Sequence, residues 1–201
     1  MVRSTPGGQA DLFGREAAKL PAGLDYVERW MAPAEQAALI GRFADVPVSP
    51  FRFQGWLGKR RTASFGWHYD FDRGRFAAAA PIPDFLLPVR DRAAASAGLA
   101  ADDLVQALVT RYDPGAGIGW HRDRPVFEHV VGLSLEAPAT LRLRRRTSSG
   151  FDRASLDLAP GSLYHLSGAV RHDWEHSIAA MDVRRWSVTF RSLRADTSAV
   201  Q

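Results

Sequence analysis

The sequence has no cysteine among its 201 residues, and this absence removes several classes of chemistry at once. Disulfide bonds, zinc–thiolate sites and thiol nucleophiles are all excluded. A chain without cysteine suits a reducing compartment, so we expect a cytoplasmic protein. Long apolar runs are also missing: none approaches the roughly 20 residues that span a bilayer, and the first 20 residues lack the apolar core of a signal peptide. We therefore expect no membrane partner.

Lysine is nearly absent, although the formal net charge is +4 and the sequence pI is about 9.9. Almost all of the positive charge is therefore guanidinium, which binds carboxylates and phosphates bidentately. The excess is compatible with a polyanionic partner and equally with a basic protein whose arginines are only solvated. The hydrophobic content of 46% is enough for one sizeable core. We expect a monomer with one domain over 21–195, a flexible arm at 1–20 and a tail at 196–201.

The N-terminal half predicts two helices with an irregular segment between them. Pro33 opens a stretch whose apolar residues recur at helical spacing. A second helix is expected over 84–96, with Gly98 just past its end and with Pro88 favouring a kink or a later start. The intervening stretch 49–76 is rich in glycine, arginine and aromatic residues without a clean period. We interpret it as a loop or hairpin that covers a site.

The C-terminal half changes to short apolar stretches separated by Gly- and Pro-containing turns. This pattern predicts strands at 104–112, 130–135, 139–145, 154–158, 162–166 and 185–193. Helices followed by many short strands indicate an α+β fold, in which N-terminal helices pack on one sheet of a jelly-roll barrel. We expect the barrel core over about 104–194.

The last predicted strand has two chemically different faces. Side chains two residues apart point to the same side of a strand, so one face carries Arg185, Ser187, Thr189 and Arg191. The other face is apolar. Buried arginines need anionic partners, and a dicarboxylate would supply two. The alternative is a solvated polar face above a buried apolar one.

A histidine and an aspartate stand two residues apart in the segment GIGWHRDRP, at His121 and Asp123. On an extended strand both side chains point to one face. A histidine from a distant strand would complete a 2-His-1-carboxylate triad, which leaves positions on Fe(II) open for substrate and O2. The candidates are His165, His172 and His176. The pair alone also fits a surface histidine beside an aspartate.

Several motifs together resemble the AlkB branch of the Fe(II)/2-oxoglutarate-dependent dioxygenases. These are HRD at 121–123, Trp-Glu-His-Ser-Ile at 174–178, Arg-Trp-Ser-Val-Thr-Phe-Arg at 185–191 and Tyr-Asp-Pro-Gly at 112–115. The likeness covers about 104–193 and is weaker upstream. It implies a double-stranded β-helix, the jelly-roll or cupin-like barrel. It also selects His176 as the third iron ligand beside His121 and Asp123, because the ligand in related sequences follows a tryptophan by two positions.

The same resemblance implies Fe(II) as the metal, 2-oxoglutarate as the cosubstrate and O2 as the oxidant. Arg185 matches the arginine that pairs with the far carboxylate of the cosubstrate, and Arg191 matches one near its iron-side end. Tyr112 matches a tyrosine that hydrogen-bonds the cosubstrate. Further polar residues expected to line it are Thr110, Ser187 and Thr189, although Thr110 and Ser187 stand where members of the family carry asparagine.

The resemblance and the basic balance favour oxidative demethylation of alkylated bases in DNA or RNA, with single strands preferred because unstacking a base costs energy. The residues expected to meet this substrate are Arg60, Arg61, Trp67, His68 and Tyr69. Two alternatives stay open: the same chemistry on a protein side chain or a small molecule, and a non-catalytic nucleic-acid-binding module. The basic run at 142–146 could follow phosphates, although such runs are more often a solvated strand face.

Overall fold

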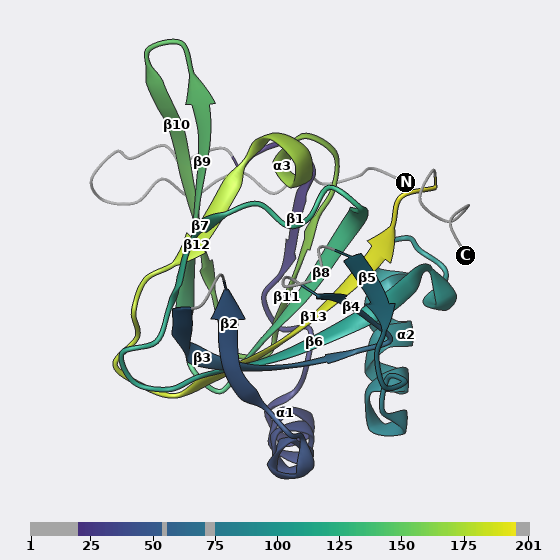
Figure 1. Ribbon diagram of the computed structural model, residues 1–201. Coiled ribbons are helices and arrows are strands. Elements are labelled where there is room, and N and C mark those ends of the chain that lie inside the picture. Colours follow the sequence, from purple (N-terminus) through teal and green to yellow (C-terminus); the bar gives the residue numbers. More distant parts are fainter. Residues whose placement is uncertain (1–19, 54–55, 71–74, 196–201) are drawn as a thin grey trace, which may run out of the picture.

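Figure 1 shows the computed structural model of the protein, which describes residues 20–53, 56–70 and 75–195. Within these ranges, no side chains are described at 52–53, 56–57, 68–70 and 75–78. The arm expected at the N-terminus, apart from residue 20, and the tail expected at 196–201 lie outside the described residues.

The larger of two main sheets has seven antiparallel strands. Its order is β1 (Leu24–Val27), β11 (Ser162–Leu166), β8 (Phe127–Leu135), β13 (Arg185–Leu193), β6 (Leu104–Tyr112), β3 (Trp56–Phe65) and β2 (Ser49–Phe53). The last strand in the chain, β13, therefore lies in the middle of this sheet between β8 and β6.

The smaller sheet has four antiparallel strands and faces the inner side of the larger one (Figure 1). Its order is β10 (Gly150–Leu158), β9 (Ala139–Thr147), β12 (Glu175–Ile178) and β7 (Ile118–His121). A short helix, α3 (Gly168–Asp173), leads from β11 into β12. A separate hairpin is formed by β4 (Trp67–Asp70) and β5 (Arg75–Ala78).

Apolar residues on the outer face of the larger sheet pack against the N-terminal helices. These helices are α1 (Pro33–Arg42) and α2 (Leu87–Ser96), flanked by the single turns Phe43–Asp45, Asp84–Leu86 and Ala101–Asp103. Trp186, Val188 and Phe190 of β13 are all buried in this core, and the ring of Phe43 lies 5.0 Å from that of Trp186. The alternation of β13 therefore places its apolar face under the helices, as the sequence predicts.

A second core fills the space between the two sheets. Leu141 and Leu143 of β9 point inward, whereas Arg142 between them is exposed. They meet apolar residues of β8, β10 and β11 in one buried cluster. This inward packing holds the smaller sheet against the larger one and so fixes the strands that carry the site.

The α+β prediction is confirmed, and the strands predicted at 104–112, 162–166 and 185–193 have the observed bounds. The segment 49–76 differs from its prediction, because β2 and β3 join the larger sheet and only β4 and β5 form a separate hairpin. Pro88 lies in the first turn of α2, so the helix starts late and follows a single 3-10 turn. Within the described residues, no helix is long and apolar enough to cross a membrane.

Candidate metal centre

The two histidines of the site come from neighbouring strands of the smaller sheet. His176 of β12 is paired directly with His121 at the end of β7, so both imidazoles project from the same face, with ring centroids 4.3 Å apart. Asp123 follows two residues later, and its Oδ2 lies 3.6 Å from Nε2 of His176. One ligand atom from each residue lies within 4.8 Å of the other two. In the part of the chain that the structure describes, no other group of three such residues meets this condition.

The protonation states of the three residues suit metal binding. Nδ1 of His121 lies 2.9 Å from the carbonyl oxygen of Gly119, which can only accept, so Nδ1 donates and Nε2 keeps its lone pair. Burial and the neighbouring His121 lower the pKa of His176 to about 3, which keeps the ring neutral. Burial alone would raise the pKa of Asp123, but Arg191 and the two imidazoles hold it well below its usual range. The site therefore presents two neutral imidazoles and one carboxylate.

Arg191 of β13 fixes the carboxylate of Asp123. Its Nε and Nη2 lie 2.9 Å and 2.7 Å from Oδ1, and its Nη1 donates to Oε1 of Gln106 at 3.0 Å. Gln106 in turn donates to the carbonyl oxygen of Trp67 at 2.6 Å. The start of the β4–β5 hairpin is thus joined to the metal centre through two side chains.

Arg171 of α3 fixes the backbone that follows Asp123. This arginine is buried and donates through Nη2 to the carbonyl oxygens of Arg124 and Phe127, the latter at 2.7 Å. A charge buried in this way is stabilised by the acceptors around it. The segment that carries the aspartate is therefore held from α3 on one side and from β13 on the other.

A buried cation lies on the inner face of the larger sheet, on the same face of β13 as Arg191. Arg185 is only 1% exposed, and its Nε and Nη2 both donate to Oγ of Ser134, at 3.2 Å and 3.0 Å. Its Nη1 has no hydrogen-bond partner among the described residues. The ring of Tyr112 lies 5.1 Å from the guanidinium carbon. An unpaired buried guanidinium donor calls for an anion, and a carboxylate would fit it.

The comparisons with known proteins agree with this donor set. A family model described as the 2OG-Fe(II) oxygenase superfamily matches residues 23–191. The chain belongs to this superfamily. It therefore contains a 2OG-Fe(II) oxygenase domain, and the relatives that it resembles are AlkB homologues.

Two curated relatives match part of this oxygenase. It is 28% identical over 166 residues to the tRNA (carboxymethyluridine(34)-5-O)-methyltransferase alkbh8 of Xenopus tropicalis, covering 79% of this chain and 25% of that protein. It is 27% identical over 149 residues to the Alkylated DNA repair protein ALKBH8 homolog of Arabidopsis thaliana, covering 61% of this chain and 43% of that protein. The solved structure of OsALKBH1 shares the fold, with a TM-score of 0.67, 16% identity and coverage of 87% and 98% of the two chains.

The polar face predicted for β13 is buried in the oxygenase, not solvated. Arg185, Ser187, Thr189 and Arg191 are all buried, and Thr110 is paired with Ser187 across β6 and β13. The residues expected to line the cosubstrate therefore share one inner surface with the metal centre. Burial of this face removes the alternative of a merely solvated strand.

The residues expected to meet the substrate fall on different surfaces of the oxygenase. Arg60 lies over the ring of Phe51 at 3.8 Å, and burial lowers its pKa while the neighbouring Tyr112 raises it. Arg61, next in the chain, faces outward, is paired with Asp113 at 3.7 Å and has a side chain that is 48% exposed. Arg60 is thus the arginine of the pair that faces the site.

The other expected residues are placed as follows. Trp67 is half-buried at the start of β4, and the side chains of His68 and Tyr69 lie outside the described residues. The two rejected histidine candidates are held elsewhere: His165 lies 3.0 Å from His129, and His172 lies 3.1 Å from Glu128.

Sequence reasoning missed Tyr164 and Gly132, which lie on the same inner surface. A Cβ at Gly132 of β8 would overlap the ring of Tyr164 of β11, so only glycine leaves room for that ring. Burial raises the pKa of Tyr164 to about 12, against the lowering effect of Arg185, so the hydroxyl stays protonated. A glycine inside the apolar strand segment VVGLSL was the available signal, because such a glycine often marks a close approach.

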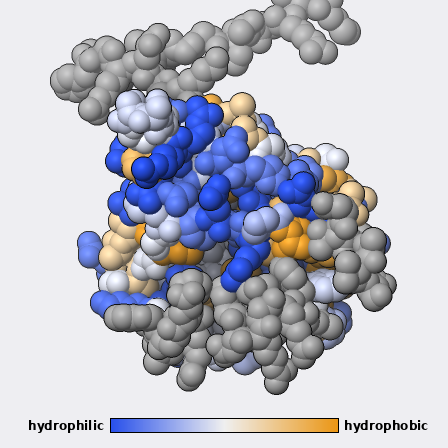
Figure 2. Space-filling view, turned by 45° about the horizontal axis from the view of Figure 1, so that its top comes forward, coloured by the Kyte–Doolittle hydropathy of each residue, from blue (hydrophilic) through white to orange (hydrophobic). Residues whose placement is uncertain are grey.

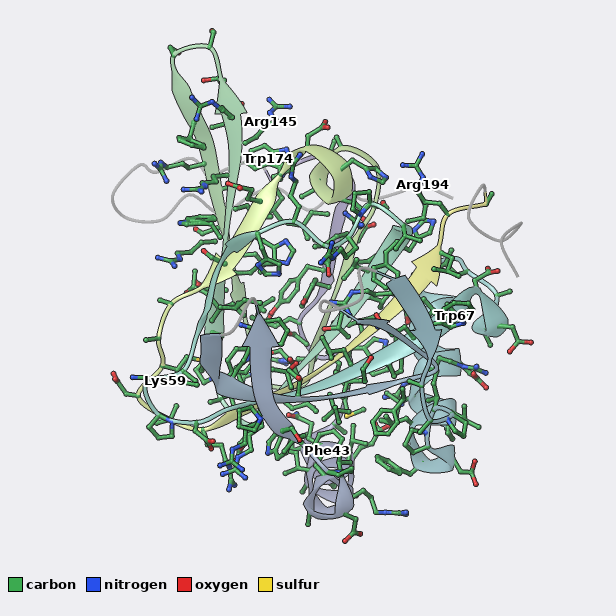
Figure 3. All side chains as sticks on the ribbon, viewed as in Figure 1. Phe43, Lys59, Trp67, Arg145, Trp174 and Arg194 are labelled. Atoms are coloured by element: carbon green, nitrogen blue, oxygen red, sulfur yellow. The ribbon has the colours of Figure 1, made fainter. Side chains whose placement is uncertain are left out.

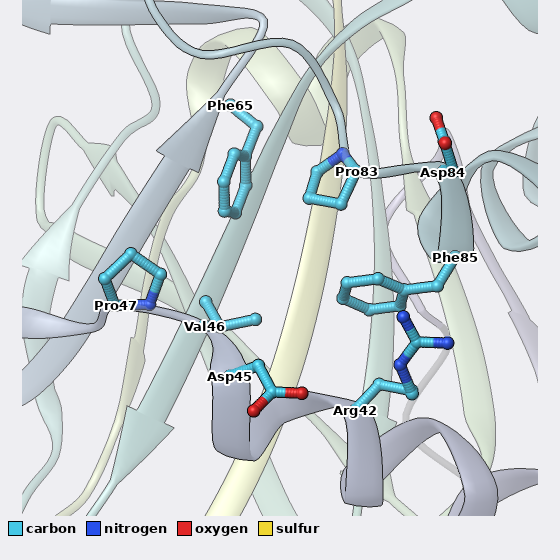
Figure 4. A pocket seen from close by; sticks show the side chains of 8 residues that line it. All are labelled: Arg42, Asp45, Val46, Pro47, Phe65, Pro83, Asp84 and Phe85. Carbon is cyan, nitrogen blue, oxygen red and sulfur yellow. The ribbon is translucent and has the colours of Figure 1, made fainter.

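A surface pocket of about 370 Å³ lies apart from the metal centre (Figure 4). It is formed by residues from the end of α1, the end of β3 and the turn before α2, with Phe65, Pro83 and Phe85 around it. Arg42 lies over the ring of Phe85, 4.9 Å from its centroid. None of the residues that line this pocket belongs to the metal centre.

Proposed function

We propose that this oxygenase oxidatively removes alkyl groups from bases of single-stranded nucleic acid, DNA or RNA. The observation that carries the proposal is the convergence of His121, Asp123 and His176, together with a donor of the buried Arg185 that has no partner among the described residues. Such a pair of sites suits a divalent metal and a dicarboxylate. The names of the two curated relatives refer to tRNA and to alkylated DNA. Because the chain spans 25% and 43% of their lengths, the substrate is our proposal.

In this proposal His121, Asp123 and His176 hold Fe(II), and Arg185 pairs with the far carboxylate of 2-oxoglutarate. When bound, the metal and cosubstrate use O2 to hydroxylate a C–H bond of the substrate while 2-oxoglutarate is converted to succinate and CO2. A hydroxylated N-methyl group then leaves its base as formaldehyde. The strand order of the two sheets supports the interpretation that the site lies inside a double-stranded β-helix.

The protein's own residues orient and shield these groups. Arg191 holds Oδ1 of Asp123 and leaves Oδ2 beside His176 for the metal. Tyr112 and Tyr164 are both buried: the Tyr112 ring lies 5.1 Å from the guanidinium carbon of Arg185, and Arg185 acts to lower the pKa of Tyr164, so both rings would exclude water around the far carboxylate. A dry surrounding strengthens the ion pair of Arg185 with a carboxylate, because the local dielectric is low.

The substrate would enter on the side where β3 and the β4–β5 hairpin border the metal centre. Arg60 is close enough to His121 to lower the pKa of that imidazole, so it can meet a phosphate near the target base. Trp67 offers a ring beside the hairpin that could border an unstacked base.

Product detection tests this proposal directly. The full chain with Fe(II), 2-oxoglutarate and ascorbate is incubated with methylated oligonucleotides of DNA and RNA and, in parallel, with methyl-lysine peptides. We expect succinate and formaldehyde with the oligonucleotides and no formaldehyde with the peptides. Formaldehyde from the peptides alone would show a protein substrate. Absence of succinate under every condition would show that the fold has no catalytic activity and would favour a binding module.

A further inference from the structure

The outer face of the smaller sheet carries arginines interleaved with aromatic rings. Alternate residues of β9 point to this face, and the register of β10 places Phe151 opposite Arg146 and Arg153 opposite Arg144. Trp120 of β7 joins them across β12. We name this group the arginine ladder, and its members are Trp120, Arg142, Arg144, Arg146, Phe151 and Arg153.

The members of the arginine ladder lie against one another in cation–π contacts. Arg144 lies between both rings, 4.4 Å from the centroid of Trp120 and 4.7 Å from that of Phe151. Arg142 lies 5.2 Å from Trp120, and Arg146 and Arg153 lie 5.8 Å and 5.5 Å from Phe151. These contacts hold the guanidinium groups over the sheet and present the ring of Phe151, which is 36% exposed.

The charge of the ladder is poorly balanced by acidic residues. Glu175 pairs with Arg144 at 2.6 Å, and within the described residues Arg142 donates only to Oγ of Ser177. Among the described residues, Arg146 and Arg153 have no carboxylate within ion-pair distance. A strand face whose arginines are only solvated needs no aromatic rings between them. The rings between these arginines therefore distinguish the ladder from an ordinary basic run.

On the opposite face of the same hairpin, the arginine has an acidic partner. Arg145, the neighbour of Arg146 in the chain, is paired with Asp152 at 2.7 Å. It also lies 5.2 Å from the ring of Trp174, and Figure 3 shows these two side chains close together beside β9. Arg145 is therefore matched by an acid and a buried ring, whereas on the ladder face Arg146 and Arg153 have no acidic partner in the part of the chain that the structure describes.

The ladder extends beyond the body of the molecule. β12 pairs with β9 only from Arg142 to Arg144, so the outer ends of β9 and β10 pair with each other alone and project as a ribbon (Figure 1). Figure 2 shows that this end of the molecule is mainly hydrophilic. Alternate residues on a strand are about 7 Å apart, so three arginines of β9 form an evenly spaced row of cations.

We propose that the arginine ladder binds a single-stranded segment of nucleic acid outside the catalytic pocket. This inference rests on the proposed function and names a second contact surface for the same substrate. Phosphates of one strand would meet the row of guanidinium groups, and an unpaired base would stack on Phe151. A duplex offers no free base face to that ring. Trp120 and Glu175 each adjoin a metal-ligand histidine in the chain, so the ladder lies on the reverse side of the strands that carry those histidines.

Binding of an unmethylated, fluorescein-labelled 15-nucleotide single-stranded RNA, followed by anisotropy, tests the ladder without turnover. We expect R146Q/R153Q to weaken binding roughly tenfold and to reduce the slope of log affinity against log salt by about 1.4, since each lost phosphate contact removes roughly 0.7 on a single strand. The charge-matched control R145Q/R184Q removes two arginines outside the ladder and should bind within twofold of the unmodified protein. Equal loss in both double variants would overturn the proposal in favour of general electrostatic attraction.

The aromatic part of the ladder has its own pair of variants. F151L keeps an apolar side chain without a ring and should weaken binding roughly fivefold or more, whereas F151Y keeps the ring and should bind normally. The same affinity for both variants would overturn the stacking contact. A duplex of the same sequence, or vesicles containing anionic lipid, bound as tightly as the single strand would overturn the assignment of the partner.

Turnover separates failure of this inference from failure of the proposed function. If the ladder is right, R146Q/R153Q loses activity on a methylated 15-mer while keeping it on a methylated trinucleotide, which is too short to reach both surfaces. Equal activity of R146Q/R153Q and the unmodified protein on both lengths would overturn the ladder and leave the proposed chemistry intact. The anisotropy result would stand by itself even if no methylated base were turned over.

Discussion

Arg191 binds one oxygen of the Asp123 carboxylate with two nitrogens and leaves the other oxygen 3.6 Å from His176. The two oxygens of this carboxylate therefore have different roles. Its Oδ1 neutralises a buried guanidinium, and its Oδ2 faces the imidazole with which it would share a metal. Since the two residues are far apart in the chain, the pairing of β13 within the larger sheet determines the orientation of a ligand attached to the smaller one.

Replacing His176 tests whether its imidazole binds the metal beside Oδ2 of Asp123. H176Q should lower iron-dependent succinate formation by more than about 100-fold, because loss of even an outer partner of a metal ligand typically costs 10–100-fold. Binding of Mn(II), measured by calorimetry, should fall in parallel.

The matched control for this variant is H172Q. His172 stands four residues earlier in the chain, belongs to α3 and is bonded to Glu128 at the surface. H172Q should keep both metal binding and succinate formation. Normal turnover in H176Q together with a loss in H172Q would mean that the third ligand has been misassigned.

Arg185 gives a prediction about the cosubstrate that does not depend on turnover. With Mn(II) in place of Fe(II), 2-oxoglutarate at 100 times its dissociation constant should raise the free energy of unfolding by about 2.7 kcal/mol. R185M should lose most of this stabilisation, and without cosubstrate it should be no less stable than the unmodified protein, because a buried and only partly paired charge is removed.

The control for R185M is R184Q, which changes the adjacent residue. Arg184 is exposed and paired with Glu136 at 2.6 Å, away from the inner surface. It should keep the full response to 2-oxoglutarate. The assignment of Arg185 is refuted by an R185M variant that 2-oxoglutarate stabilises as strongly as R184Q.

Period-two alternation predicted the parts of the fold in which each strand face has one chemical character. β6, β11 and β13 follow this rule, and their bounds agree with the sequence. The strands β7 and β12 escaped prediction because they are only four residues long and place His121 and His176 where a core residue would stand. Functional sites are where local sequence rules fail, because chemistry replaces packing there.

β3 shows a different limit of prediction. Its arginines and glycine suggested a loop, yet pairing with β6 makes the segment a strand and sends Arg60 and Arg61 to opposite faces. Which arginine faces the site depends on register, and register depends on a partner strand more than 40 residues away in the chain. The contact between Arg191 and Asp123 could not be predicted from the sequence either, because it forms only when the two sheets face each other.

Gly132 provides a test of packing on the inner surface. G132A should destabilise the protein by about 1–3 kcal/mol, because the added methyl overlaps the Tyr164 ring and a packed core resists overpacking. Urea unfolding measures the change. G41A, in helix α1 with no atom within 4 Å of the added methyl, should instead stabilise by about 0.5–1 kcal/mol.

A double variant shows whether the Tyr164 ring is the cause. G132A combined with Y164L should be less destabilised than the sum of the two single changes, because the smaller side chain frees the space that the methyl needs. Additive effects would mean that the methyl at position 132 strains something other than the ring.

His165 gives a prediction about pH that lies away from the metal centre. Burial lowers its pKa below the usual value near 6.5, as does His129 at 3.0 Å, whereas Asp25 at 3.6 Å raises it. The folded protein therefore holds this proton less tightly than the unfolded chain does. The contribution of the neutral ring to stability is fully present above pH 6.5 and is lost as the pH falls toward the folded-state pKa. One such proton can change the free energy of unfolding by at most about 1.4 kcal/mol per pH unit.

Urea unfolding between pH 7.5 and 5.5, with chelator present, should show a shallower pH slope for H165Q than for the unmodified protein. Identical slopes would mean that His165 is protonated equally in both states, which its burial beside His129 argues against.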